Sequence, residues 1–109
     1  MSITTILKER KDRTRHLRKD ALNEAKRLSS LLRRHYEFEA LYLYGSVLTD
    51  RFGFHSDIDM AIKGMRVEVF FKAYAILIKE SKYEIDLKPF EELTDELREK
   101  VLSGGIRIG

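Results

Sequence analysis

The chain has 109 residues and a mass of 12.8 kDa, which is the length of one domain. Its 21 Lys and Arg against 18 Asp and Glu give a net charge of +3, and its 43% hydrophobic content excludes an intrinsically disordered chain. The sequence has no cysteine, which excludes disulfides, thiolate zinc sites and cysteine nucleophiles. No apolar run reaches the roughly 20 residues of a membrane span, so we expect a soluble cytoplasmic protein without a signal peptide.

The first third of the chain predicts one long basic helix over residues 1–36. Residues 3–36 contain neither Pro nor Gly, and residues 1–36 hold 11 Lys and Arg against 4 Asp and Glu. Apolar side chains recur there at steps of three and four: Leu17, Ala21, Ala25, Leu28, Leu31 and Leu32. A continuous helix of this length would measure about 50 Å, more than the width of a small domain. We therefore expect the half from Leu17 to pack on a core, and the first half to project or bend.

The remaining residues, 39–109, predict a small sheet with helices. The predicted strands are 39–44, 58–63 and 82–87, the first ending at a Gly-Ser turn and the last ending before Pro89. A short helical turn is expected over 47–52, followed by a loop over 53–56.

Two further helices complete the predicted fold. Residues 66–80 carry a helical apolar stripe, formed by Val67, Phe70, Phe71, Tyr74, Leu77 and Ile78. Thr94 is placed to N-cap a last helix that ends before Gly104. We expect Tyr42, Tyr44 and the aromatic residues of 70–74 to build the core. The order of elements predicts an α/β (α+β) fold, with a small mixed β-sheet of three to four strands and flanking helices.

Acidic side chains stand at the predicted strand ends. Residues i and i+2 of a strand point to one face, so Asp57 and Asp59 project together while Ile58 faces the core. Two like charges side by side require neutralisation, and carboxylates suit Mg²⁺, which takes one or two of them and fills its octahedron with water and phosphate oxygens. A third carboxylate, Asp86 on the adjacent strand, would complete a two-metal clamp.

A glycine and a serine supply the other half of the candidate site. Gly45 lets a phosphate approach the backbone, the following turn can direct its N–H groups at an anion, and the Ser46 hydroxyl can bond a phosphate oxygen. Taken singly, the Gly-Ser pair is more often an ordinary turn, the Asp-x-Asp pair a solvated strand end or cap, and Asp86 a surface residue. The spaced combination of Gly-Ser and Asp-x-Asp arises by chance in on the order of one chain in a thousand of this length. The pattern therefore indicates a nucleoside triphosphate held by a turn and by metal.

The segment LYGSVLTDRFGFHSDIDMAI, followed by EIDL and LREKVLSGGIRI, resembles the minimal nucleotidyltransferase (MNT) family of the DNA polymerase β superfamily. The resemblance runs from about residue 41 to residue 108. It implies a nucleotidyltransferase fold, with one domain over 1–109 in which a long basic helix (1–36) precedes a catalytic core (39–109). It also implies a last short strand after the final helix.

The same resemblance implies residue roles and a reaction. Gly45 and Ser46 would hold the triphosphate of ATP. Asp57, Asp59 and Asp86 would bind Mg²⁺, and Asp86 would also be the base that activates the acceptor hydroxyl. AMP would then be transferred from ATP with loss of pyrophosphate. Members of the family commonly carry an Arg-Pro-Asp/Glu-like stretch where this chain has Gly53, Phe54 and His55, which leaves nucleotide preference and rate open.

The resemblance also implies a partner. The common family member is an antitoxin encoded beside a HEPN ribonuclease toxin, which it neutralises by transferring AMP to a tyrosine. Because the chain leaves no room for an acceptor-recognition domain, we expect the partner to bring the missing surface. Two alternatives stay open: an antitoxin that neutralises its partner by binding alone, and a nucleotidyltransferase acting on RNA or on a small-molecule hydroxyl.

Several basic residues are not assigned by these motifs. Residues 8–19 hold seven Lys and Arg against two acids, which fits a solvated helix face, a nucleic-acid arm or a contact surface for an acidic partner. No aromatic residue interleaves to stack on bases, so nucleic acid is the less favoured of these. Arg51 could reach a phosphate or be a solvated turn residue. His55, Lys63 and Lys88 flank the motif without diagnostic spacing, and we interpret them as surface residues.

Overall fold

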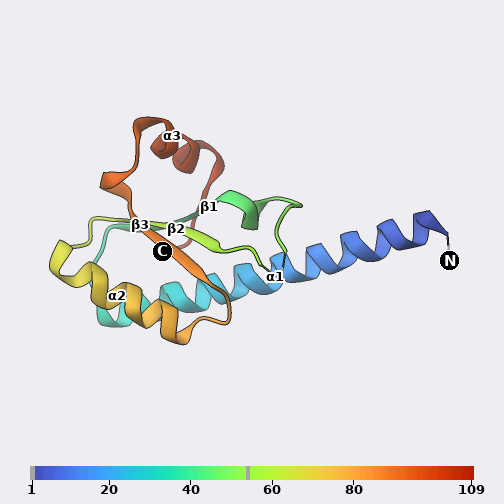
Figure 1. Cartoon of the computed structure of the whole chain (residues 1–109). Coiled ribbons are helices and arrows are strands. Elements are labelled where there is room, and N and C mark those ends of the chain that lie inside the picture. The colour runs from blue at the N-terminus through green and yellow to red at the C-terminus, as the bar shows by residue number, and fades with distance from the viewer. Residues whose placement is uncertain (1, 54) are drawn as a thin grey trace.

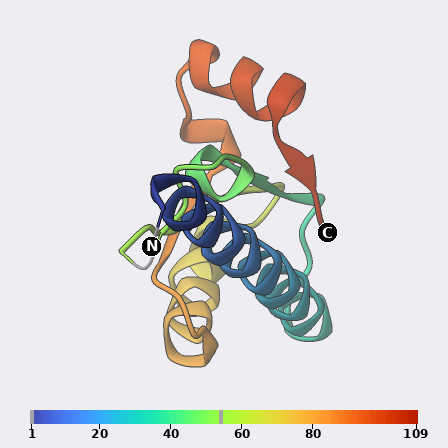
Figure 2. The ribbon, with the colours of Figure 1, turned by 90° about the vertical axis from the view of Figure 1, so that its right-hand side faces the viewer.

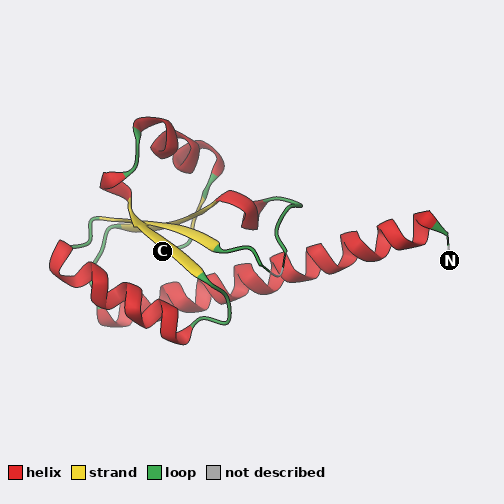
Figure 3. Ribbon diagram, in the orientation of Figure 1, coloured by secondary structure: helices red, strands yellow, loops and turns green. Residues whose placement is uncertain are grey.

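The computed structural model describes residues 2–53 and 55–109 and has an α+β architecture (Figures 1 and 3). In chain order its elements are α1 (Ile3–His35), β1 (Ala40–Tyr44), η1 (Gly45–Leu48), β2 (Ile58–Lys63), α2 (Val67–Glu80), β3 (Ile85–Pro89), η2 (Phe90–Glu92), α3 (Asp95–Gly104) and β4 (Ile106–Arg107), η denoting a 3-10 helix. The strands form one sheet in the order β3-β2-β1-β4. Strands β2 and β3 are parallel, and β1 is antiparallel to β2 and β4. The predicted mixed sheet, flanking helices and long N-terminal helix are confirmed.

Helices α1 and α2 cover one face of the sheet (Figure 1). The main core lies between them and the sheet, and Ile58, Met60 and Ile62 of β2 reach it as alternate residues of one strand. Leu28 and Leu32 of α1 are fully buried against the same cluster. Each such side chain contributes about 1.5–3 kcal/mol through burial, so this face holds the sheet together.

A smaller cluster covers the opposite face beneath η2 and α3. Its buried members are Ala61, Phe90, Leu93 and Val101, with Tyr42, Tyr44 and Leu97 partly buried around them. The hydroxyl of Thr94 accepts a hydrogen bond from the Leu97 N–H, which confirms the predicted N-cap of α3. This face is therefore covered by fewer buried side chains than the face under α1 and α2.

Helix α1 is one continuous helix of 33 residues, about 50 Å long. Its buried positions begin at Ala21, and residues 3–13 are exposed along their whole length. The helix therefore projects past the sheet and does not bend back on it (Figure 1). Within residues 2–53 and 55–109, no helix is both long enough and apolar enough to cross a membrane.

Some predicted element boundaries are wrong. The turn after β1 is a 3-10 helix that begins at Gly45, two residues before the expected start at Val47. Strand β3 covers Ile85–Pro89, later than the predicted 82–87, and Pro89 belongs to it. Because β3 is an edge strand, a residue without an N–H is tolerated there. Helix α3 likewise includes Gly104, which was expected to follow it.

The predicted apolar stripe of α2 is only partly a core stripe. Phe70 and Leu77 are buried, whereas Phe71 and Val67 are each 73% exposed and Ile78 is 62% exposed. A helix that packs on one sheet face buries a narrow band, so side chains at the edges of a wide apolar arc stay in solvent. The expectation that all aromatic residues of 70–74 build the core is therefore wrong for Phe71.

Candidate active site

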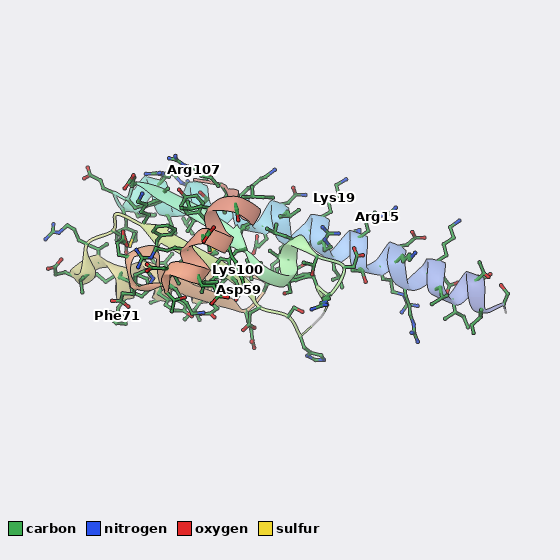
Figure 4. The ribbon with its side chains drawn as sticks, turned by 90° about the horizontal axis from the view of Figure 1, so that it is seen from above. Arg15, Lys19, Asp59, Phe71, Lys100 and Arg107 are labelled. Carbon is green, nitrogen blue, oxygen red and sulfur yellow. The ribbon has the colours of Figure 1, made fainter. Side chains whose placement is uncertain are left out.

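Three site residues form a row across neighbouring strands. Asp59 of β2 pairs in register with Tyr44 of β1 on one side and with Asp86 of β3 on the other. Directly paired residues project from the same face, about 5 Å apart. Because Met60 points into the main core, Asp59 points to the α3 side, from which Figure 4 views the molecule. The sheet register thus brings two of the three predicted carboxylates together.

The third predicted carboxylate, Asp57, immediately precedes β2 and is exposed. Asp59 is half-buried, and this burial raises its pKa above the usual value for an aspartate. The neighbouring carboxylates of Asp86 and Asp57 raise the pKa of Asp59 further, while Lys88 opposes them. The site therefore concentrates negative charge that favours a cation.

Gly45 begins η1 with φ +80°, a backbone conformation that side chains other than glycine rarely adopt. A Cβ built on Gly45 would overlap a carboxylate oxygen of Asp59 and lie 3.3 Å from its Cγ. The Ser46 carbonyl accepts hydrogen bonds from the N–H and the hydroxyl of Thr49, both at 2.9 Å, which closes the turn. Gly45 thus lies beside Asp59, and Ser46 follows it in the closed turn.

Lys88, which lies beside the row, and Tyr44, which belongs to it, were not predicted as site residues. The Lys88 ammonium donates a hydrogen bond of 2.8 Å to Asp86, and this bond raises the pKa of Lys88. The Tyr44 hydroxyl is buried without a hydrogen-bond partner among the described residues, and burial raises the pKa of Tyr44. The i, i+2 spacing of Asp86 and Lys88 on a strand was the available signal for Lys88, and the signal for Tyr44 was its place directly before Gly45.

A pocket of about 680 Å³ opens beside Gly45 and Ser46, between η1 and α3. Its lining residues are Tyr44, Gly45, Ser46, Leu48, Thr49, Arg51, Leu97, Lys100, Ser103 and Gly104. Arg51 and Lys100 supply cationic groups to it, Lys100 from a helix far along the chain (Figure 4). The size is typical of small-molecule pockets, and its charge suits a phosphate-bearing ligand.

The acidic row fits Mg²⁺ by its donor chemistry. Mg²⁺ is commonly bound by one or two protein carboxylates, and Asp59 and Asp86 are direct register partners. Within the described part of the chain, no group of three potential ligands is gathered tightly enough to form a ready-made metal site. In this conformation Lys88 is the cation bound to Asp86.

The other flanking residues carry less information. Lys63 pairs with Glu39 at 3.5 Å on the surface, and His55 is exposed, as predicted. Of the unusual stretch Gly53, Phe54 and His55, Phe54 lies outside the described residues.

Comparison with known proteins places this geometry in a family. The model of the polymerase β nucleotidyltransferase family matches residues 26–109. A crystal structure of a toxin-antitoxin with AMP-PNP resembles the chain with a TM-score of 0.66 and 23% identity, over 80% of this chain and 73% of that one. No curated protein matches the sequence. The chain belongs to the polymerase β nucleotidyltransferase family.

Proposed function

We propose that this chain is an antitoxin that transfers AMP from ATP to the hydroxyl of a tyrosine on a partner HEPN-type toxin. The observation that carries the proposal is the contact of Gly45 with Asp59, which joins the Gly-Ser turn to the register pair of Asp59 and Asp86. The Gly-Ser turn and the acidic residues of one motif thus lie side by side at the end of β1 and the start of β2, in a chain of the nucleotidyltransferase family.

We assign the donor half of the site to Gly45, Ser46 and the pocket beside them. The backbone at the start of η1 would receive the triphosphate, and the cationic groups of Arg51 and Lys100 would attract it from the pocket walls. Asp57, Asp59 and Asp86 would hold Mg²⁺. When bound, the metal would neutralise charge on the phosphates and orient them.

The transfer itself is one displacement. The acceptor oxygen attacks the α-phosphorus of ATP and forms the new ester bond, while the bond to the bridging oxygen of pyrophosphate breaks. We assign the proton of the acceptor hydroxyl to Asp86, the outermost carboxylate of the row. Lys88, bonded to Asp86, would fix the direction of that carboxylate.

The partner is proposed from the structural neighbour, because that protein is described as a toxin-antitoxin with AMP-PNP and covers 80% of this chain. We propose that residues 39–109 are the catalytic core and that 1–36 serve as a projecting helix within a single domain.

The test is AMP transfer to the protein encoded beside this gene. That protein should gain the mass of one AMP when incubated with the chain, ATP and Mg²⁺. The double variant Asp57→Asn/Asp59→Asn should slow the transfer by at least about a hundredfold. Asp95→Asn, a carboxylate 99% exposed on α3, is the matched control and should transfer AMP normally.

Two results would contradict the proposal. The first is no gain of mass. The second is full neutralisation of the partner by the double variant, which would assign the protein to antitoxins that act by binding alone.

A further inference from the structure

The exposed half of α1, here named the α1 arm and defined as residues 3–18, lies outside the candidate active site. Residues 3–13 are exposed and reach about 16 Å along the helix axis, and burial of α1 begins only at Ala21. Figure 1 shows the arm extending past the sheet on the side where η1 lies.

The apolar tip of the arm lies in line with the stripe that packs α1 on the core, and the polar residues Arg10 and Thr14 separate the two. At 100° per residue, positions 3, 7, 10, 14, 17 and 21 lie within about 40° of one line along the helix. Leu17 and Ala21 belong to the core on this line, whereas Ile3 is 76% and Leu7 is 53% exposed. Exposed apolar side chains bordered by charged ones are typical of an interaction surface, which makes the arm a candidate docking surface.

Between the apolar tip and the core the arm is strongly basic. Residues 8–19 hold seven Lys and Arg against two acids. A pocket of about 320 Å³ lies against it, lined by Arg10, Lys11, Thr14, Arg15, Arg18 and Asp50. Such a surface complements an acidic one and would repel a basic partner.

The arm is tied to the candidate active site through η1. Arg18 donates a hydrogen bond from Nε to the carbonyl of Val47, in η1, and pairs through Nη1 with Asp50, both at 3.4 Å. Asp50, which follows η1, lines the basic pocket. Its two chain neighbours, Thr49 and Arg51, line the pocket beside Gly45 and Ser46. Figure 2, viewed from the side of the N-terminus, shows the arm below η1 and α3 above it. A partner seated on the arm would therefore face the open edge of the site.

We propose that the α1 arm is the docking surface for the acceptor protein, which presents an apolar helix face edged by Asp and Glu. The inference rests on the proposed function, which supplies an acceptor protein. The exposed tip residues Ile3, Ile6 and Leu7 favour protein over RNA, because an RNA backbone would leave them in water. The arm also has no Phe, Tyr or Trp on which bases could stack.

Binding of the full-length chain to the protein encoded beside its gene tests the proposal. Two arm variants, Arg10→Glu/Lys11→Glu and Ile3→Ser/Leu7→Ser, should each weaken binding about tenfold or more. Their matched controls are Lys26→Glu/Arg34→Glu on the exposed body of α1, and Ile78→Ser/Leu102→Ser at other exposed apolar positions. The controls should bind within about twofold of the wild type, and circular dichroism should show unchanged helix content.

A second set of measurements separates docking from catalysis. Asp57→Asn/Asp59→Asn should bind the neighbour normally, while losing AMP transfer and the rise in Tm that ATP with Mg²⁺ gives the wild type. Arm-dependent binding without AMP transfer would overturn the proposed reaction and leave the docking surface standing. AMP transfer with undiminished binding by both arm variants would overturn the docking surface alone.

Three other outcomes overturn the docking proposal. One is that the neighbour does not bind at all. Another is that a mixed-sequence single-stranded RNA binds and depends on the arm cations, while binding of the neighbour does not. The last is that the arm variants dissolve a dimer of the chain, seen by light scattering, without changing neighbour binding.

Discussion

Gly45 lies so close to the carboxylate of Asp59 that a Cβ on Gly45 would overlap it, and the turn after β1 is therefore packed against Asp59 of β2. The space above Gly45 is filled by Asp59, whose Cγ would be 3.3 Å from a Cβ at that position. The φ of +80° at Gly45 turns the backbone sharply into η1 as soon as β1 ends. Glycine is thus required at position 45 for two reasons: the positive φ disfavours other residues, and Asp59 leaves no room for a side chain.

Gly45→Ala is therefore expected to destabilise the protein by about 1–2 kcal/mol and to displace Asp59. Urea unfolding measures the free energy, and the ATP-dependent rise in Tm measures the site, which should be lost. The control is Gly53→Ala, because a Cβ at Gly53 meets nothing within 4 Å. Retention of nucleotide binding by Gly45→Ala would show that the contact with Asp59 is not needed.

Lys88→Gln is expected to tighten the proposed Mg²⁺ site. Lys88 is hydrogen-bonded to Asp86 at 2.8 Å, so its ammonium competes with a metal ion and adds positive charge beside it. Removing it should lower the Kd for Mg²⁺ by about three- to tenfold, as measured by titration calorimetry without nucleotide. Lys72→Gln on the exposed face of α2 is the control. Weaker Mg²⁺ binding by Lys88→Gln would contradict competition between the two cations.

Glu24 links α1 to the loop before β3 and should make stability depend on pH. It is 3% exposed and accepts hydrogen bonds from Arg27 at 2.6 and 3.1 Å and from the Lys82 N–H at 2.8 Å. The bond from Arg27 above all lowers the pKa of Glu24 below 4.5. Because the pKa of Glu24 is lower in the folded than in the unfolded protein, its ionised form stabilises the fold at any pH above the unfolded-state pKa. This stabilisation is lost as the pH falls through the folded-state pKa.

Glu24→Gln should therefore cost about 1–2 kcal/mol of unfolding free energy at pH 7. The difference from the wild type should shrink as pH falls below 4.5, the range in which the wild-type carboxylate takes up a proton. Urea unfolding at several pH values measures it, with the exposed Glu37→Gln as control. A cost that does not change with pH would mean that the charge of Glu24 is not what stabilises the fold.

Tyr83 should ionise at a higher pH than an ordinary tyrosine. Its hydroxyl donates a hydrogen bond of 2.5 Å to Asp20, and burial together with this bond raises the pKa of Tyr83 to about 12. Because the neutral form is favoured in the fold, its contribution is present below pH 10 and is lost as pH rises toward 12. Tyr83→Phe should remove the late step, at about pH 12, of the tyrosinate absorbance titration, whereas Tyr36→Phe should keep it.

Tyr83→Phe should also lower the free energy of unfolding by about 1 kcal/mol at pH 7, since the ring stays packed and only the hydrogen bond to Asp20 is lost. If the late ionisation step persists in Tyr83→Phe, it belongs to another tyrosine.

The sequence alone predicted the elements and the motif because both depend on local spacing. The periodicity of α1 and α2, the strand at 58–63 and the capping of α3 by Thr94 follow from neighbours within a few residues. The i, i+2 spacing around Ile58 likewise placed Asp59 opposite the core. Boundaries near turns were less well predicted: η1 begins at Gly45, two residues before the expected Val47, and Gly45 packs against Asp59, a residue 14 positions later.

Only the tertiary structure decided which residues meet. The register of β1, β2 and β3 aligns Tyr44, Asp59 and Asp86, and the return of α3 brings Lys100 to the same side as Gly45. The i, i+2 spacing places Lys88 on the same side of β3 as its partner Asp86, but only the register shows that Asp86 lies beside Asp59. The length of α1 was predictable, but its direction past the site edge was not, since strand pairing and helix packing set it through contacts far apart in the chain.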